Sequence, residues 1–181
     1  MPVATARARF ARPDLTTFCR LDELDLVVTG QRLEPDRAVL ACRVLTPDEW
    51  CRRCGAEGAA RDTVIRRLAH EPLGWRPTVL EVAVRRYRCT GCGHVWRQDT
   101  TRAAEPRSKL SRRGLRWALE ALVVQHLTVT RIAEGLDVAW DTASPSAIRA
   151  TVRCATTSPS NALRSARQDN FARGSAALPM S

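Results

Sequence analysis

The sequence predicts an α+β protein in which a β-hairpin and a cysteine-bearing β-ribbon precede a small helical domain, between disordered termini. Two Cys-x-x-Cys-Gly units are separated by residues 55–88, and an alternating apolar run leads into the second unit. Beyond that unit, apolar residues recur at helical spacing. The alternation predicts strands up to the second unit, and the later periodicity predicts helices.

The cysteine spacing predicts a metal site. A two-residue gap lets both sulfurs of a pair turn toward one point, and two such pairs supply the four thiolates of a structural zinc site. Gly55 and Gly93 close the two units, where a tight turn favours positive φ. We therefore expect one structural, non-catalytic zinc ion. The alternatives are two unrelated pairs, a redox pair, or His94 as a substitute ligand. The predicted ligands are Cys51, Cys54, Cys89 and Cys92.

Composition favours a polyanionic partner. The formal charge is +10, and Lys109 is the only lysine among 29 basic residues. Nucleic acid is the first expectation and an acidic membrane surface the second, although so many arginines also fit a G+C-rich genome. With no apolar leader or membrane span apparent, we expect a reducing bacterial cytoplasm, close to the nucleoid. Cys19, Cys42 and Cys154 are then free, partly buried thiols.

The first half of the chain is expected to be β-structured. We expect a disordered basic N-terminus over residues 1–18, and the hairpin and ribbon over residues 19–100. The hairpin strands are expected from residue 24 to 29 and 38 to 45, with a turn at Gly30-Gln31. Residues 62–68 predict an exposed strand at best, 70–77 a turn, and 78–88 the clearest strand, with one buried face. That face comprises Leu80, Val82 and Val84.

The second half is expected to be helical. Residues 101–110 predict a basic linker, 111–153 a helix-turn-helix domain and 154–181 a disordered tail. Ser111 predicts the cap of a helix over 112–127, with His126 on its apolar side. Thr128 or Thr130 caps a second helix to Leu136, and a third begins at 141–144 after a turn. The expected inward residues of the second helix are Ile132, Ala133 and Leu136.

The tryptophans are expected to pack rather than to bind. Trp50, Trp75 and Trp96 flank the ribbon, and we expect them to cover the metal site and the hairpin. Trp140 is expected to pack within the turn between the second and third helices. Stacking on nucleic-acid bases is the alternative for each.

This order of elements resembles the N-terminal part of bacterial insertion-sequence transposases of the ISL-three family. The resemblance covers roughly residues 20–144. Its most specific parts are Cys51, Cys54, the run from Arg85 to Cys89, and Ile132-Ala133-x-x-Leu136-x-Val138-x-Trp140-x-Thr142. It implies a zinc ribbon and a helix-turn-helix that together recognise the DNA ends of a mobile element.

The sequence departs from this family at several positions. Asp137 replaces the usual glycine of the turn, and Ala143 replaces a larger apolar residue. Pro145 leaves two alternatives: Ser144 caps a helix that starts late, or the helix is broken there. The family continues with a domain bearing an Asp-Asp-Glu triad, which nothing after Pro145 resembles. We therefore expect a truncated or frameshifted copy that is not an enzyme.

The resulting expectation is sequence-specific binding of double-stranded DNA at element ends, compatible with a homodimer. The residues expected near phosphates are Arg107, Lys109, Arg112 and Arg113. Those expected at the helix-turn-helix contact are Arg131, Asp141, Thr142 and Ser144, the last two reaching base edges. The alternative is a zinc-ribbon module for protein interaction or transcriptional regulation, and an active enzyme ranks third.

Overall fold

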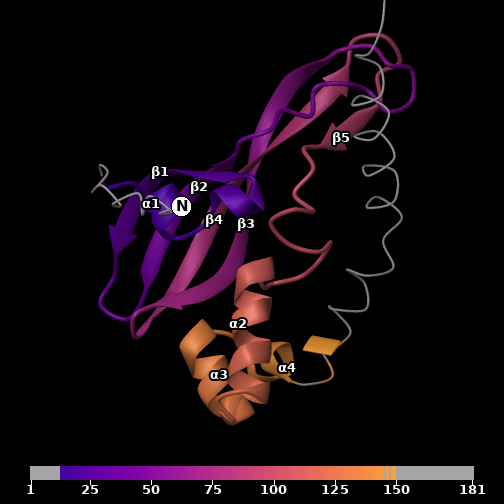
Figure 1. Cartoon of the computed structure of the whole chain (residues 1–181). Coiled ribbons are helices and arrows are strands. Elements are labelled where there is room, and N and C mark those ends of the chain that lie inside the picture. The colour runs from indigo at the N-terminus through magenta and orange to yellow at the C-terminus, as the bar shows by residue number, and fades with distance from the viewer. Residues whose placement is uncertain (1–12, 145, 147, 150–181) are drawn as a thin grey trace, which may run out of the picture.

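The computed structural model describes residues 13–144, 146, 148 and 149. A twisted five-stranded mixed sheet carries three helices at one end and the two cysteine units at the other (Figure 1). The α+β class is confirmed. The strands are β1 (Leu26–Leu33), β2 (Ala38–Val44), β3 (Gly58–Leu73), β4 (Arg76–Cys89) and β5 (Val95–Arg97). The helices are α1 (Leu15–Phe18), the 3-10 turn η1 (Asp22–Leu24), α2 (Arg112–Val123), α3 (Val129–Leu136) and α4 (Trp140–Ala143).

The chain is ordered earlier than expected. Residues 13–18 belong to the predicted disordered N-terminus, but Asp14 caps α1 by accepting hydrogen bonds from the backbone amides of Thr16 and Thr17. Such a cap satisfies amides that a short helix leaves unpaired. Residues 1–12 and the predicted tail, 154–181 with Cys154, lie outside the described residues.

The predicted hairpin is present as the antiparallel pair of β1 and β2. Its turn lies at residues 34–37, where Glu34 N donates to Arg37 O, and not at Gly30-Gln31. Gly30 instead sits in β1 at a register shift, with Ala41 as its partner. The sheet order is β1-β2-β4-β3, and β2 runs parallel to β4 with Leu40 opposite Leu80. The hairpin and the ribbon strands therefore share one sheet.

β3 is much longer than the exposed strand predicted over 62–68. It pairs with β4 from Gly58 to Leu73, so the predicted turn at 70–77 is reduced to Gly74 and Trp75. Gly74 has a φ of +64°, which glycine adopts without strain. Over residues 61–67 exposed residues alternate with half-buried ones, which include Asp62 and Arg66, because one side of the strand faces solvent.

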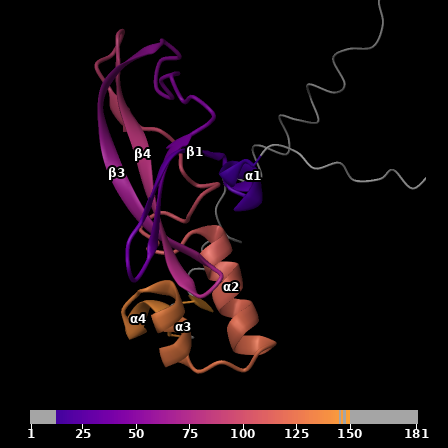
Figure 2. The same cartoon turned by 90° about the vertical axis from the view of Figure 1, so that its left-hand side faces the viewer.

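One core lies on a single face of the sheet. Leu80, Val82 and Val84 are buried, as predicted for the face they share. They pack in a cluster with residues of η1, β2 and β3, and with Ala103 and Ala104. The segment 101–110, expected as a linker, therefore contributes to the core. Figure 2 shows α1 beside the sheet, and α2, α3 and α4 beneath it.

A network of hydrogen bonds fastens the start of α2 to β3. Ala69 N donates to Lys109 O at 2.8 Å, and Ser111 N donates to Ala69 O at 2.9 Å. Ser111 is the predicted N-cap of α2, and its hydroxyl accepts from Gly114 N. A Cβ on Gly114 would lie 2.7 Å from Ala69 O, so only glycine permits this close approach of helix and strand.

A second core joins the helices. Ile132, Ala133 and Leu136 of α3 are buried as predicted, and they pack with residues of α2, with Ala143 of α4 and with Ile148. Thr128 caps α3 by accepting from Arg131 N.

α2 is shorter than the helix predicted over 112–127. It ends at Val123, three residues before His126. His126 was expected on the apolar face of this helix, but it is exposed and has a φ of +53°, because it lies in the turn that follows.

The third predicted helix is one turn long. α4 ends at Ala143, and Ser144 has an extended backbone with ψ at 147°. Asp137 turns the chain between α3 and α4 with a φ of +52°. Trp140 was expected to pack in this turn, but it opens α4 and is 56% exposed. Among the described residues, no helix is long and apolar enough to cross a bilayer.

Candidate metal centre

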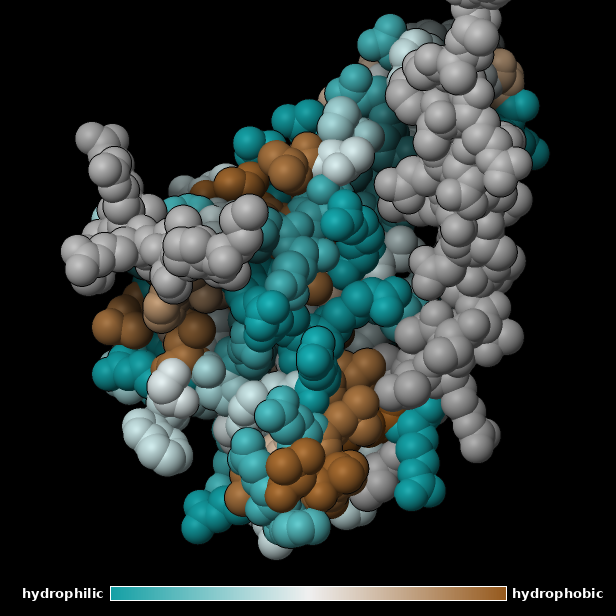
Figure 3. All heavy atoms as spheres, in the orientation of Figure 1, coloured by the Kyte–Doolittle hydropathy of each residue, from teal (hydrophilic) through white to brown (hydrophobic). Residues whose placement is uncertain are grey.

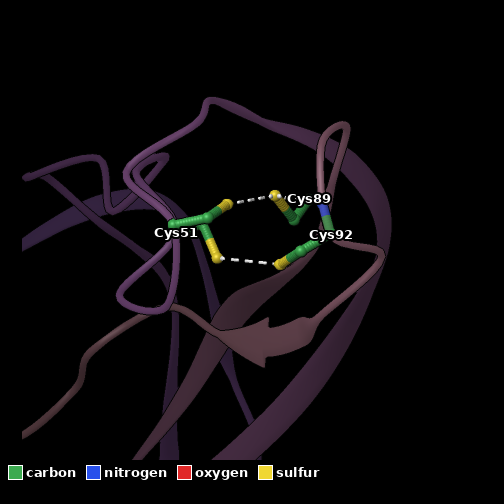
Figure 4. A group of neighbouring side chains, drawn as sticks. Cys51, Cys89 and Cys92 are labelled. Carbon is green, nitrogen blue, oxygen red and sulfur yellow. Dashed lines mark hydrogen bonds between the residues drawn. The ribbon is translucent and has the colours of Figure 1, made fainter.

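Four sulfurs converge where the loop after β2 meets the end of β4. The Sγ atoms of Cys51, Cys54, Cys89 and Cys92 all lie within 4.8 Å of one another. Cys51 and Cys92 are 3.7 Å apart, and Cys54 and Cys89 are 3.3 Å apart. Figure 4 shows the labelled Cys51, Cys89 and Cys92 pointing toward a common centre.

These distances fit a tetrahedral metal site. Zinc–thiolate bonds of about 2.3 Å place tetrahedral sulfurs about 3.8 Å apart. The separations of 3.7 and 3.3 Å lie just below that value, and no pair exceeds 4.8 Å, so the four cysteines could hold one zinc ion. Four thiolates would fill a tetrahedral coordination shell and leave no position for a bound water. No second group of three or more metal-binding side chains occurs among the described residues.

The two glycines shape the turns as predicted. Gly55 and Gly93 have φ values of +74° and +70°. Gly55 N donates to Cys51 O at 2.9 Å, and Gly93 N donates to Cys89 O at 3.3 Å. Each turn thereby brings its two cysteines to the same side of the chain, so the pairs face each other.

Backbone amides prepare one thiol for metal binding. Cys92 N donates to the sulfur of Cys89 at 3.4 Å, and this bond lowers the pKa of Cys89 to about 6. The Ala56 amide likewise lowers the pKa of Cys54. The adjacent sulfurs of Cys89 and Cys92 outweigh this effect and raise the pKa of Cys54 to about 11. Close sulfurs cannot all ionise without a cation, and a divalent metal removes that repulsion.

Further contacts tie the two turns together. Thr90 donates to Glu57 O from both its amide, at 3.2 Å, and its hydroxyl, at 2.8 Å. A Cβ on Gly91 would lie 3.3 Å from the Ala56 Cβ, so the turns are already in close contact. The geometry of the four sulfurs therefore depends on both turns.

Aromatic rings support the site from β4 and β5. Tyr87 and Trp96 are stacked with centroids 5.6 Å apart, and the Trp96 indole donates to Asp48 O at 2.8 Å. His94, weighed as a substitute ligand, stacks on Trp96 with centroids 6.1 Å apart and is not part of the sulfur cluster.

Only one of the three flanking tryptophans covers the site as expected. Trp50 is largely exposed, and Trp75 is fully exposed in the turn between β3 and β4, at the end of that hairpin remote from the cysteines. The other free thiols, Cys19 and Cys42, are buried in the sheet core, as expected.

Two of the predicted phosphate contacts are held within the chain. Arg112 forms an ion pair with the buried carboxylate of Glu105. Arg113 forms one with Glu71 at 2.6 Å and another with Glu23 at 3.2 Å. Arg113 therefore fastens the start of α2 to β3, and Arg112 fastens it to the segment that precedes the helix.

The other predicted DNA contacts are more open. Arg107 and Lys109 are exposed, and Arg107 has a φ of +63°. Arg131 is exposed on α3 and forms a surface ion pair with Glu134 at 3.2 Å. Asp141 is exposed and Thr142 half-buried, whereas Ser144 is buried and donates to Asp141 O at 2.9 Å.

A basic groove that local sequence patterns do not predict lies beside the metal centre. This groove has a volume of about 640 Å³ and lies between β3, β4 and the segment from β5 to α2. Figure 3 shows hydrophilic residues gathered where that segment crosses the sheet. The arginines are evident in the sequence, but local patterns do not predict that the segment folds over the sheet. Four arginines line the groove: Arg52, Arg66, Arg97 and Arg107.

No family model, curated protein or solved structure matches the chain.

Proposed function

We propose that the chain binds double-stranded DNA sequence-specifically, as the end-recognition part of a transposase similar to the ISL-three family. In this proposal the cysteine unit is a zinc ribbon, and α3 and α4 form the two helices of a helix-turn-helix. The observation that carries it is the helical pair itself. α3 and α4 share buried residues and present polar side chains on the outside.

The helical pair has features that such a motif needs. Leu136 and Ala143 are fully buried, which fixes the two helices against each other. Asp137 supplies the left-handed turn between them. Arg131 in the first turn of α3, and Asp141 and Thr142 at the start of α4, remain on or near the surface. A recognition helix reads bases from its N-terminal residues, so Thr142 is suited to that role.

Ser144 supports the late-start alternative for the recognition helix. Its backbone is extended, and Ile148 N donates to Ser144 O at 3.0 Å, as at the start of a helix. In this proposal the polar surface near DNA is formed by two short segments, α4 before Ser144 and the helical residues that follow it. Ser144 itself, which is buried, positions Asp141 and does not reach a base.

Zinc has a structural part in this proposal. Cys51, Cys54, Cys89 and Cys92 would hold it, and it would supply cross-linking of the two turns without acting on a substrate. The formal charge of +10 supports a polyanionic partner, because arginines displace the counterions that surround DNA.

Binding to DNA that flanks the coding sequence tests the proposal. Wild-type protein should shift the terminal inverted repeats more strongly than a scrambled sequence of equal length. Thr142→Ala should lower that preference by about tenfold, the range expected for one lost base contact. Arg131→Gln should weaken binding to both DNAs alike. Equal affinity of the wild type for the repeat and the scrambled DNA contradicts sequence-specific recognition.

One observation favours the alternative of a protein-interaction module. Trp75 is fully exposed beside a groove of about 540 Å³ that Trp117 and Leu127 also line. Exposed tryptophan next to an apolar groove is typical of protein interfaces. Under that alternative, Trp75→Ser abolishes partner binding, and the DNA measurements above show no sequence preference.

A further inference from the structure

A row of charged side chains with more arginines than carboxylates crosses the sheet near the metal centre. Arg86 of β4 lies directly opposite Asp62 of β3 on one side and Arg97 of β5 on the other. Residues directly opposed in antiparallel strands share a face, and like charges in such a pair are destabilising. Asp62 accepts two hydrogen bonds from Arg86. Arg97 forms no ion pair with any described residue.

The single carboxylate of this row serves more than one arginine. Its hydrogen bonds with Arg86 lower the pKa of Asp62, and the charges of Arg86, Arg61 and Arg97 lower it further. Three guanidinium groups therefore act on one carboxylate. The row keeps an excess of positive charge that the neighbouring strands do not neutralise.

Arg97 belongs to the same basic groove that Arg66 and Arg107 line. Arg66 is half-buried there and donates to Thr100 Oγ1 at 2.7 Å, Glu105 O at 2.6 Å and Ser108 O at 3.2 Å. All three acceptors are neutral, and Arg66 forms no ion pair within the described part of the chain; the nearby Glu105 carboxylate, which acts on its charge, is itself paired with Arg112. Arg107 is exposed and, like Arg97, forms no ion pair with a described residue.

Acidic residues are scarce in this groove. Asp99 is the one acidic residue that lines it, and its side chain accepts from Thr101 N at 2.8 Å. Arg52, which also lines the groove, forms a surface ion pair with Asp48 at 3.2 Å. Four arginines and one aspartate leave a local excess of positive charge, with the Thr100 and Thr101 side chains beside it.

We propose that this groove binds the phosphodiester backbone of one DNA strand. The inference rests on the proposed DNA binding and assigns its phosphate contacts to Arg97, Arg66 and Arg107. Guanidinium groups donate two parallel hydrogen bonds to phosphate oxygens, and threonine hydroxyls add neutral donors.

The extent of the charged row favours a strand over a small anion. Arg97 lies level with Asp62 across β4, and Arg66 lies four positions further along β3 on the same face, which corresponds to about 13 Å along a strand. A DNA strand rises about 3.4 Å per nucleotide, so this length matches about four nucleotides. A free phosphate would contact one part of the row and leave the rest without an anion.

The test is the salt dependence of DNA affinity. Arg97→Gln with Arg107→Gln removes two groove charges that form no ion pair with described residues. Arg43→Gln with Arg85→Gln is the matched control, because both side chains are exposed on the opposite face of the sheet. Affinity for a labelled duplex is measured by fluorescence anisotropy between about 50 and 200 mM salt. Circular dichroism and zinc content of each variant report whether it is folded.

Each phosphate contact contributes about 0.9 to the slope of log affinity against log salt. The groove variant should therefore lose about 1.8 from the slope on repeat and scrambled duplexes alike, while the control keeps the wild-type slope. An unchanged slope in the groove variant, or an equal loss in both variants, overturns the inference. Competition by inorganic tripolyphosphate at equal phosphate concentration, as effective as duplex DNA, also overturns it in favour of a small-anion site.

The two proposals can fail separately. If repeat and scrambled duplexes bind equally and the groove variant still loses the slope, the backbone groove stands and sequence-specific recognition fails. If the repeat is preferred and the slope is unchanged, recognition stands and the groove inference fails. Absence of any DNA binding overturns both.

Discussion

The Ser111 hydroxyl lies 2.9 Å from Nδ1 of His70, in the fully buried joint between α2 and β3. The same hydroxyl accepts from Gly114 N as the cap of α2, so a single oxygen joins the helix cap to the imidazole of β3. Neutral His70 is thereby part of the attachment of the helices to the sheet.

Acid should weaken this joint. Burial lowers the pKa of His70 from its ordinary value of about 6.5 to about 4. The unfolded chain therefore takes up the proton first, and stability falls as the pH drops from 6.5 toward 4. The loss is about 1.4 kcal/mol per pH unit and about 3 kcal/mol in all. Urea unfolding at several pH values measures it.

The matched comparison for that prediction is His70→Gln against His126→Gln. His126 is exposed, so its replacement should leave the pH dependence of the wild type unchanged. His70→Gln should flatten it over the same interval, whatever its stability at pH 7. Identical pH dependence in all three proteins contradicts the assignment to His70.

Metal content should be one zinc ion per chain. Cys54→Ser removes one of four ligands, and we expect it to lose the metal and the order of both turns, because metal binding and folding are coupled in such sites. Elemental analysis and circular dichroism before and after chelation measure this. Cys42→Ala, in the sheet core, should keep the metal. A wild-type chain that folds without zinc and gains nothing from it contradicts the prediction.

Gly58→Ala should destabilise the protein. A Cβ at Gly58 would collide with the indole of Trp96, whose CZ2 atom would be 2.8 Å away. Overpacking of this kind costs about 1–3 kcal/mol. Gly30→Ala is the control, because its Cβ would make an ordinary contact 3.7 Å from Ala41. Thermal unfolding should rank Gly58→Ala well below Gly30→Ala, and the reverse order would show that Trp96 is not held against β3.

Arg113→Gln should act on stability and not on DNA affinity. Its side chain is 14% exposed and bonded to Glu71, and its loss would leave that carboxylate unpaired. We expect a loss of about 1–3 kcal/mol in the free energy of unfolding. Lys109→Gln, an exposed neighbour, should leave stability unchanged. If Arg113→Gln lowered the salt dependence of DNA affinity and left the free energy of unfolding unchanged, Arg113 would be a phosphate contact and not a structural residue.

Local patterns in the sequence were sufficient for several elements. The hairpin, the buried face of β4, the caps at Ser111 and Thr128 and the glycine turns follow from residues close in the chain, and all are confirmed. The cysteine spacing likewise predicted the clustering of the four sulfurs.

Long-range pairing could not be read in the same way. Nothing local indicates that β2 runs parallel to β4, or that Ala103 and Ala104 fill the core beneath a charged segment. The partners of Arg112 and Arg113 depend on that packing, so two arginines predicted to contact phosphates form partly buried ion pairs within the chain.

The first rung of the β3–β4 pair, Gly58 opposite Cys89, places a metal ligand at the start of this ladder. Zinc would therefore fix the alignment of two strands that run about 36 Å from Gly58 to Ala69. A slip of two residues would preserve the faces of the strands but move Ala69 away from Lys109 and Ser111. The ion would thus fix the register of β3 against β4. Its loss would weaken the hydrogen bonds of Ala69 that attach α2 at the other end of the sheet.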